Sequence, residues 1–375
     1  MAAPAATATG ARVFNFSAGP CTLPLEVMER ARDEFVEFRD EKRSHGMSLL
    51  EMSHRSEPVM AVRDAAASLV RELLDVPSTH RVVFLGGGAT LQFGMVPMNL
   101  LAPGRSAAYA DCGAWSAKAI KDAERVGAVE RVWDGSAHDY MTLPDPADLA
   151  SATPADAAYL HLCSNETIQG LQMQAYPEVA PPVVCDMSSD FLSRPVAVRD
   201  FGLIYAGAQK NIGPAGVAVV IVRDDVLEAC RGDTVGYLGY AGHVKGDSML
   251  NTPPVFQIRM IQLVLEWLRD RGGVEWAAGQ AEQRSRILYD AIVRSGGFYR
   301  CPVDPGFRSK MNVVFRLPDA DLEQSFVSQA DEAGFSGLKG HRSVGGCRAS
   351  IYNAMPVAGA EALAEFMDDF ADRHG

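Results

Sequence analysis

One lysine of the sequence stands between two apolar runs that predict buried strands. Residues 203–206 and 217–222 have strand-like composition, and the loop between them carries Lys210 among Gly, Ala, Gln, Asn and Pro. Burial and nearby cations lower the pKa of a lysine and make its amine a nucleophile, which suits Schiff-base chemistry. A loop lysine pointing into water is the commoner alternative. The glycines around Lys210 favour a close approach of the backbone to a bound group.

An aspartate upstream suggests what that group is. Asp186 ends the apolar run at 183–186, one predicted strand before Lys210. Pyridoxal phosphate requires a lysine for its aldehyde and an aspartate against its pyridinium nitrogen. The aspartate keeps that nitrogen protonated, so the ring can accept electrons from a carbanion. For Asp186 taken alone, a helix cap is an equally good interpretation.

A glycine loop predicts a place for the phosphate of such a cofactor. The predicted strand at 81–85 runs into Gly86-Gly87-Gly88, and a helix should begin at 89–93. Free backbone N–H groups at such a helix start bind anions. The loop has neither the glycine order of a dinucleotide site nor the Gly-Lys-Ser/Thr ending of a P-loop. A tight turn between strand and helix therefore remains the alternative.

Two residues after other predicted strands are candidates for contacts with the ring. Trp115 follows the strand at 106–110, where it could stack on a flat ring, or simply pack. Thr167 follows the strand at 157–163, where it could donate to a ring oxygen, or serve as a turn residue.

Basic residues occur in two polar loops, as His54-Arg55 and as His341-Arg342 with Arg348 shortly after. Arginine binds carboxylate or phosphate through two parallel hydrogen bonds. Against a net charge of −12, these clusters suggest a site for an acidic substrate. Each of these residues, taken singly, is more often an ordinary surface residue.

The elements that must position these residues alternate between strand and helix up to about residue 223. Such alternation predicts an α/β fold with a mostly parallel, doubly wound sheet and a site at the carboxyl ends of its strands. The remaining predicted strands of this sheet are at 129–133 and 182–186, and helices are predicted at 25–40, 56–75, 255–271 and 274–295. A smaller α+β unit follows, with strands at 312–317 and 349–352 and helices at 320–333 and 357–371.

We therefore expect three parts of the chain. Residues 1–12 form a flexible tail, 13–270 a large cofactor-binding domain, and 271–375 a small C-terminal domain. Whether the N-terminal segment contributes to the small domain is left open.

Composition excludes several classes of function. A net charge of −12 disfavours nucleic acid and anionic membranes as partners. The seven cysteines include no C-x-x-C pair, so neither a metal site nor a disulfide framework is indicated. The cysteine usage and the lack of an apolar run of membrane-spanning length predict a cytoplasmic protein. The N-terminal tail leaves open the import of a longer precursor into an organelle.

Taken together, the motifs resemble the phosphoserine aminotransferases, a branch of the class-V aminotransferases and of fold type I pyridoxal-phosphate enzymes. The resemblance covers residues 14–370, and only the joint pattern is specific. The matching segments are 15–20 (Asn-Phe-Ser-Ala-Gly-Pro), 52–55 (Met-Ser-His-Arg), 97–100 (Pro-Met-Asn-Leu), 165–168 (Asn-Glu-Thr-Ile), 190–195 (Asp-Phe-Leu-Ser-Arg-Pro), 209–214 (Gln-Lys-Asn-Ile-Gly-Pro), 251–254 (Asn-Thr-Pro-Pro) and 348–353 (Arg-Ala-Ser-Ile-Tyr-Asn).

The resemblance implies roles around pyridoxal 5'-phosphate. Lys210 would hold its aldehyde and move the proton between the substrate α-carbon and the cofactor, and Asp186 would pair with its ring nitrogen. Trp115 would stack on the ring, and Thr167 would bond its hydroxyl oxygen. The phosphate would be bound by the backbone N–H groups of Ala89 and Thr90, with help from Gln209. The active unit would be a homodimer, in which Asn251 and Thr252 of each chain reach the phosphate in the neighbouring subunit.

The resemblance also implies a reaction between acidic substrates. Glutamate and 3-phosphooxypyruvate would give phosphoserine and 2-oxoglutarate in serine biosynthesis, with 4-phosphooxythreonine as a second possible product. Arg342 would bind the α-carboxylate. The substrate phosphate or the distal carboxylate of glutamate would be bound by the other basic residues, His54, Arg55, His341 and Arg348.

Two departures from the family pattern bear on this interpretation. Thr90 stands where many members have arginine, so phosphate binding must depend on backbone and hydroxyl donors. Cys347 stands where methionine is common, which we interpret as packing. The alternatives are a cysteine desulfurase, with Cys347 as its reactive cysteine, a class-V aminotransferase for a small substrate, and a scaffold that has lost the cofactor.

Overall fold

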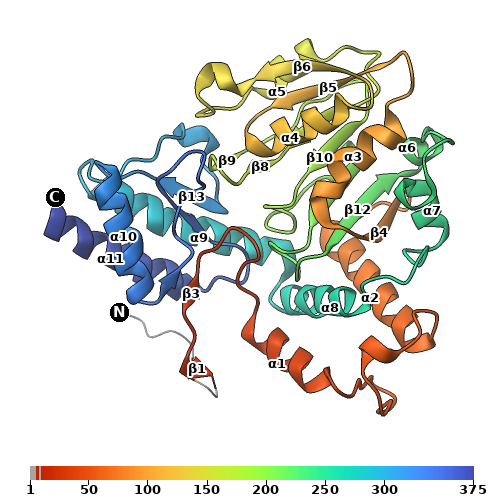
Figure 1. Cartoon of the computed structure of the whole chain (residues 1–375), viewed down its shortest axis with the longest axis horizontal. Coiled ribbons are helices and arrows are strands. Elements are labelled where there is room, and N and C mark those ends of the chain that lie inside the picture. The colour runs from red at the N-terminus through yellow and green to blue at the C-terminus, as the bar shows by residue number, and fades with distance from the viewer. Residues whose placement is uncertain (1–5, 8–9) are drawn as a thin grey trace.

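A computed structural model describes residues 6–7 and 10–375 (Figure 1). Within this part, seven strands form one central sheet, in the order β4 (His80–Gly86), β12 (Val217–Arg223), β11 (Leu203–Gly207), β10 (Val183–Asp186), β7 (Leu160–Cys163), β5 (Ser106–Asp111) and β6 (Ala128–Asp134). Neighbouring strands run parallel except around β12, which is antiparallel to both β11 and β4. The predicted α/β fold with a mostly parallel sheet is confirmed.

Helices cover both faces of this sheet, because successive residues of a strand point to opposite sides. Phe84 packs in the core shared with α2 (Glu57–Leu74) and α8 (Val255–Asp270). Its neighbours Val83 and Leu85 pack in the core shared with α3 (Gly88–Leu100) and α4 (Ala114–Ala123). The strand ends therefore lie between two helical layers, where a site can be shielded from water.

A second core lies in the C-terminal part of the chain. It is built around α9 (Gly273–Arg294), β13 (Asn312–Phe315), α10 (Ala320–Glu332), β14 (Phe335–Ser336), β15 (Cys347–Ser350) and α11 (Val357–His374). Phe14 and Phe16 from the beginning of the chain pack in this core. Their strand β3 (Phe14–Asn15) pairs in parallel with β14 and lies beside the C-terminal elements in Figure 1.

Helix α9 connects the two cores, since its Ala277 packs against the sheet core and its Leu288 against the second one. The predicted limits between the large and small domains remain a prediction. Of the predicted tail, 1–12, residues 1–5 and 8–9 lie outside the described residues, and the short strands β1 (Ala6–Thr7) and β2 (Gly10–Ala11) pair antiparallel. Among the residues that are described, no helix is long and apolar enough to cross a bilayer.

One predicted helix is too long. The helix expected at 25–40 ends at Glu34, as α1 (Leu25–Glu34). The hydroxyl of Ser48 donates to the carbonyl of Phe35 (2.6 Å), and the N–H of Phe38 donates to the carbonyl of Met47 (2.9 Å). The chain thus turns back on itself and places Phe38 in the core. The remaining short elements are α5 (Pro146–Ala152), β8 (Asn165–Glu166), β9 (Leu171–Gln172), α6 (Asp224–Glu228) and α7 (Tyr240–Lys245).

Candidate active site

Lys210 lies in the turn after β11, and its side chain is buried, with the residue only 8% exposed. Its Nζ donates to the hydroxyl oxygens of Ser189 (2.8 Å) and Thr167 (3.0 Å). Burial lowers the pKa of Lys210, an effect that the Asp186 carboxylate partly offsets. The amine therefore loses its proton more readily than an ordinary lysine and is held in a fixed direction.

Asp186 ends β10, the strand beside β11, and is also buried. Its Oδ1 accepts the N–H of Ser188 (2.8 Å). Burial raises the pKa of Asp186, while the charge of Lys210 acts in the opposite direction. The carboxylate and the amine thus lie at the same edge of the sheet and interact electrostatically.

Two predicted ring contacts lie around Lys210. Trp115 opens α4, and its ring centroid is 5.3 Å from Lys210 Nζ. Its indole Nε1 is buried and has no hydrogen-bond partner within the described chain. Thr167, which follows β8, contacts Lys210 directly. The sequence therefore identified residues that the fold brings together from three separate strands.

The predicted phosphate cradle lies at the start of α3. Gly87 and Gly88 have φ of 103° and 69°, a left-handed conformation that favours glycine. No side chain of the described residues caps this helix, so its first N–H groups, including those of Ala89 and Thr90, are free to bind an anion. A Cβ at Gly207 would lie 2.7 Å from Gln209 Oε1 and 3.3 Å from the Ala89 Cβ. Gln209 therefore packs beside the same cradle.

The candidate substrate residues fall into separate groups. Thr252 Oγ1 lies 3.5 Å from His54 Nδ1, and the adjoining Asn251 and Arg55 are exposed. His341 and Arg342 are exposed in the loop between β14 and β15, where His341 Nδ1 lies 2.7 Å from the Ser343 hydroxyl.

Arg348 differs from these residues because it is half-buried in β15. Its charge acts on Lys210, whose pKa it lowers. Burial lowers the pKa of Arg348 itself, and its Nε has no partner within residues 10–375. A half-buried arginine whose charge acts on Lys210 is suited to bind an anionic group near that amine.

Two residues that hold this site together were not predicted. Ser189 binds Lys210 Nζ, and its only sequence signal was its place just after the strand that ends at Asp186. Glu166 accepts the backbone N–H groups of Trp115 (3.0 Å) and Ser116 (2.8 Å). Its sequence signal was its position next to Thr167.

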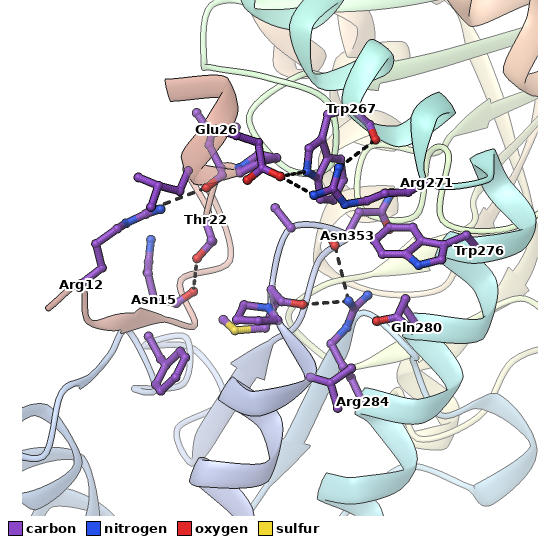
Figure 2. Close-up of a pocket in the computed structure, with 18 of the residues that line it drawn as sticks. Arg12, Asn15, Thr22, Glu26, Trp267, Arg271, Trp276, Gln280, Arg284 and Asn353 are labelled. Atoms are coloured by element: carbon purple, nitrogen blue, oxygen red, sulfur yellow. Dashed lines mark hydrogen bonds and ion pairs between the residues drawn. The ribbon is translucent and has the colours of Figure 1, made fainter. Parts of the chain in front are cut away.

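A hollow of about 430 Å³, which Lys210 does not line, lies between the N-terminal segment and the junction of α8 with α9 (Figure 2). Trp267 and Trp276 form part of its wall, with their ring centroids 5.4 Å apart. Arg284 Nη1 donates to the carbonyls of Met355 (2.8 Å) and Asn353 (3.4 Å).

Arg284, which lines this hollow, has a structural role. Its Nε and Nη2 are buried and have no partner among the described residues, so they are closed to a ligand in the hollow. The N–H of Asn353 in turn donates to Oδ1 of Asn211 (3.0 Å), the residue after Lys210. Arg284 therefore supports the turn that carries Lys210 indirectly, through Asn353 and Asn211.

The family of the chain follows from its sequence. Residues 13–363 match the family model described as Aminotransferase class-V. The chain belongs to this family. Curated class-V relatives include the phosphoserine aminotransferase of Geobacillus kaustophilus, 49% identical over 96% of this chain and 99% of its own length. That of Laribacter hongkongensis is 51% identical over 97% of this chain and 99% of its own length.

Solved aminotransferase structures agree with this assignment. The phosphoserine aminotransferase from Bacillus circulans subsp. alkalophilus superposes with a TM-score of 0.93 at 48% identity, covering 97% of this chain and 99% of that one. A pyridoxal-phosphate-bound phosphoserine aminotransferase from Trichomonas vaginalis superposes with a TM-score of 0.85 at 36% identity, covering 95% of this chain and 99% of that one. The fold is that of the fold type I aminotransferases.

Pyridoxal 5'-phosphate is the cofactor of these aminotransferases, and the residues around Lys210 fit it. The buried amine, the buried carboxylate of Asp186 and the uncapped N-terminus of α3 match its aldehyde, ring nitrogen and phosphate. The desulfurase alternative is not favoured, because Cys347 is buried in β15 and burial raises its pKa to about 12. Such a thiol is neither mobile nor reactive.

The lowered pKa of Lys210 gives a prediction for cofactor loading. Recombination of the apoenzyme with pyridoxal phosphate requires the neutral amine, so its rate should rise with pH around a midpoint below 10.5, the ordinary lysine value. Stopped-flow absorbance across a pH series measures this midpoint. Nα-acetyl-lysine, measured alongside, corrects for titration of the cofactor itself. A midpoint at or above that of the free lysine would contradict the effect of burial.

Proposed function

We propose that this chain is a phosphoserine aminotransferase. It transfers an amino group between glutamate and 3-phosphooxypyruvate, giving O-phospho-L-serine and 2-oxoglutarate in serine biosynthesis. The observation that carries the proposal is the buried Lys210 amine beside Asp186 at the carboxyl edge of the sheet, within a nearly full-length match to phosphoserine aminotransferases.

The side chains of the site have distinct parts in this reaction. When bound, pyridoxal phosphate supplies an electron sink for the negative charge that develops on the substrate α-carbon. Asp186 holds the proton on the ring nitrogen through its negative charge. The neutral Lys210 amine, oriented by Ser189 and Thr167, would take the proton from the substrate α-carbon and deliver it to the cofactor carbon that carried the aldehyde. Both half-reactions use this one site, so the kinetics are ping-pong.

Arg348 is better placed than Arg342 to bind the α-carboxylate that all these substrates share. Arg348 is half-buried and acts electrostatically on Lys210, whereas Arg342 is exposed. The α-carboxylate must lie close to the reacting carbon and therefore close to the amine. Arg342, with His341, His54 and Arg55, is then assigned to the phosphate or the distal carboxylate.

Replacing these two arginines should separate the two kinds of contact. Arg348→Ala should lower kcat/KM roughly 10- to 150-fold for phosphoserine, glutamate and alanine alike, since all three carry the α-carboxylate. This change corresponds to a loss of about 1.5–3 kcal/mol of transition-state stabilisation. Arg342→Ala, the matched control, should lower it only for phosphoserine and glutamate. Single-turnover kinetics with each amino acid measure these effects. Unchanged reaction of alanine in Arg348→Ala would show that Arg348 binds the distal anion instead.

The active unit is proposed to be a homodimer. Asn251 and Thr252 are exposed and lie with His54, and no contact to Lys210 of the same chain is found for them among the described residues. This position supports their reaching the cofactor phosphate of a neighbouring subunit. The enzyme is proposed to act in the cytoplasm, in keeping with its seven free cysteines.

A direct assay tests the proposed substrate. The purified enzyme should form 2-oxoglutarate from phosphoserine and show a higher kcat/KM with 3-phosphooxypyruvate than with 3-hydroxy-2-oxo-4-phosphooxybutanoate, the longer keto acid. A preference for the longer keto acid would assign the enzyme to 4-phosphooxythreonine formation. Activity with neither phosphorylated keto acid, together with activity on small neutral ones, would overturn the proposal in favour of a small-substrate aminotransferase.

A further inference from the structure

We propose that Glu166 is a positioning residue that holds the Trp115 ring in place against the cofactor. The inference rests on the proposed stacking of Trp115. Glu166 itself does not need to touch the cofactor or the substrate. It acts through the backbone at the start of α4.

The carboxylate of Glu166 takes the place of a helix cap. Helix α4 begins at Ala114, and the preceding residue, Gly113, has no side chain with which to cap it. Instead Glu166 Oε2 accepts the N–H of Trp115 (3.0 Å), and Oε1 accepts both the N–H and the hydroxyl of Ser116 (2.8 Å each). A carboxylate at a helix N-terminus is favoured by the helix dipole as well as by these bonds.

The local sequence permits this approach only because residue 113 is glycine. A Cβ at Gly113 would lie 2.7 Å from Glu166 Cδ. Glu166 is also fully buried, with 1% of the residue exposed. A buried carboxylate that makes three hydrogen bonds to one helix start is costly to remove or to neutralise.

The same dipeptide that holds Trp115 also holds the reactive amine. Thr167, the residue after Glu166, accepts the hydrogen bond from Lys210 Nζ (3.0 Å). Through these contacts, Glu166-Thr167 sets the position of the Trp115 ring relative to Lys210.

This dipeptide is in turn anchored to the C-terminal core. The residue before it, Asn165, accepts the hydroxyl of Ser309 (2.6 Å) and donates to Oδ1 of Asn312 (2.8 Å), and both Asn165 and Asn312 are buried. The N–H of Gly170 donates to the carbonyl of Glu166 (2.8 Å), which closes the turn. These hydrogen bonds fix the backbone of Glu166, so that its carboxylate can position the start of α4.

Three variants test the proposal. Glu166→Ala removes the whole cap, and Glu166→Gln keeps the size of the side chain but can accept from only one of the two backbone N–H groups. Gln169→Ala is the matched control, because Gln169 Oε1 accepts the neighbouring Ala114 N–H at a long distance of 3.4 Å. The measurements are the dissociation constant of pyridoxal phosphate, the visible circular dichroism of the bound cofactor, kcat and KM at saturating cofactor, and the apoenzyme Tm.

The expected result is a specific loss of cofactor positioning. Glu166→Ala should raise the dissociation constant of pyridoxal phosphate about 10- to 100-fold, reduce the visible dichroism and lower kcat with KM nearly unchanged. Glu166→Gln should lie between this variant and the wild type, and Gln169→Ala should match the wild type. A folded Glu166→Ala or Glu166→Gln enzyme with unchanged dissociation constant and dichroism would overturn the proposal, whatever its Tm.

Trp115→Ala distinguishes failure of this inference from failure of the proposed site. If Trp115→Ala weakens cofactor binding while the Glu166 variants do not, Glu166 has only a structural part. If Trp115→Ala leaves cofactor binding and dichroism unchanged, the stacking role of Trp115 is wrong and the inference falls with it.

Discussion

Lys210→Ala is expected to abolish transamination, with kcat lowered by about 10⁴-fold or more. Under the proposed roles, the variant loses both the amine that would bind the cofactor aldehyde and the base that would move the α-proton. Lys210 is buried and its amine is hydrogen-bonded to Ser189 and Thr167, so truncation to alanine removes a base whose position the fold determines. Steady-state assay and the visible spectrum of the purified protein measure the two losses separately.

Lys118 provides the matched control. Its Nζ lies 4.1 Å from the centroid of the Trp115 ring, nearer than that of Lys210, but the residue is exposed on α4. Lys118→Ala should therefore keep nearly full activity and a normal spectrum. If Lys210→Ala retained the bound-cofactor spectrum, or if Lys118→Ala lost it, the assignment of the reactive amine would be wrong.

Asp186→Asn is expected to lower kcat by about 10²- to 10⁴-fold while the protein still folds. The amide has the size of the carboxylate but lacks the negative charge that holds a proton on the ring nitrogen. KM for phosphoserine should change little, since Asp186 does not contact the substrate anions in this proposal. Single-turnover rates of the cofactor with phosphoserine measure the effect on proton removal directly.

Asp111→Asn is the corresponding control at another strand end. Asp111 ends β5 as Asp186 ends β10, it is similarly buried, and burial raises the pKa of both carboxylates. Its partners are Arg131 (3.3 Å) and the Ser116 hydroxyl (3.5 Å), so its replacement should affect stability more than kcat. Similar losses of kcat in both variants would mean that Asp186 has no special part in the chemistry.

The sequence predicted the sheet and its reactive edge because both depend on short apolar runs and on the residues directly after them. Lys210 and Asp186 were predicted in this way to lie at one edge, since parallel strands bring their carboxyl ends together, and the structure places both residues there. The end of α1 was missed, because it depends on a hydrogen bond from Ser48 to a carbonyl thirteen positions earlier in the chain.

Contacts between distant segments limited the prediction of the site in the same way. Nothing in the local sequence of Glu166 indicates that it caps a helix formed 51 residues before it. The family resemblance assigned the α-carboxylate to Arg342 and the distal anion to Arg348, but the local sequence could not test this order, because both residues lie in one glycine-rich basic segment. Their difference in burial arises only when β15 pairs with β13 and leaves the preceding loop exposed.

The pairing of β3 with β14 has a consequence for the order in which the protein matures on the ribosome. Phe14 and Phe16 are synthesised before β14 and α11, yet the core that buries them is complete only with these later elements. These aromatic side chains therefore cannot pack in their final core until β14 and α11 have been translated. Apolar side chains left unpacked in this way make a nascent chain prone to aggregation during synthesis. A chain truncated before β14 lacks the core in which Phe14 and Phe16 pack.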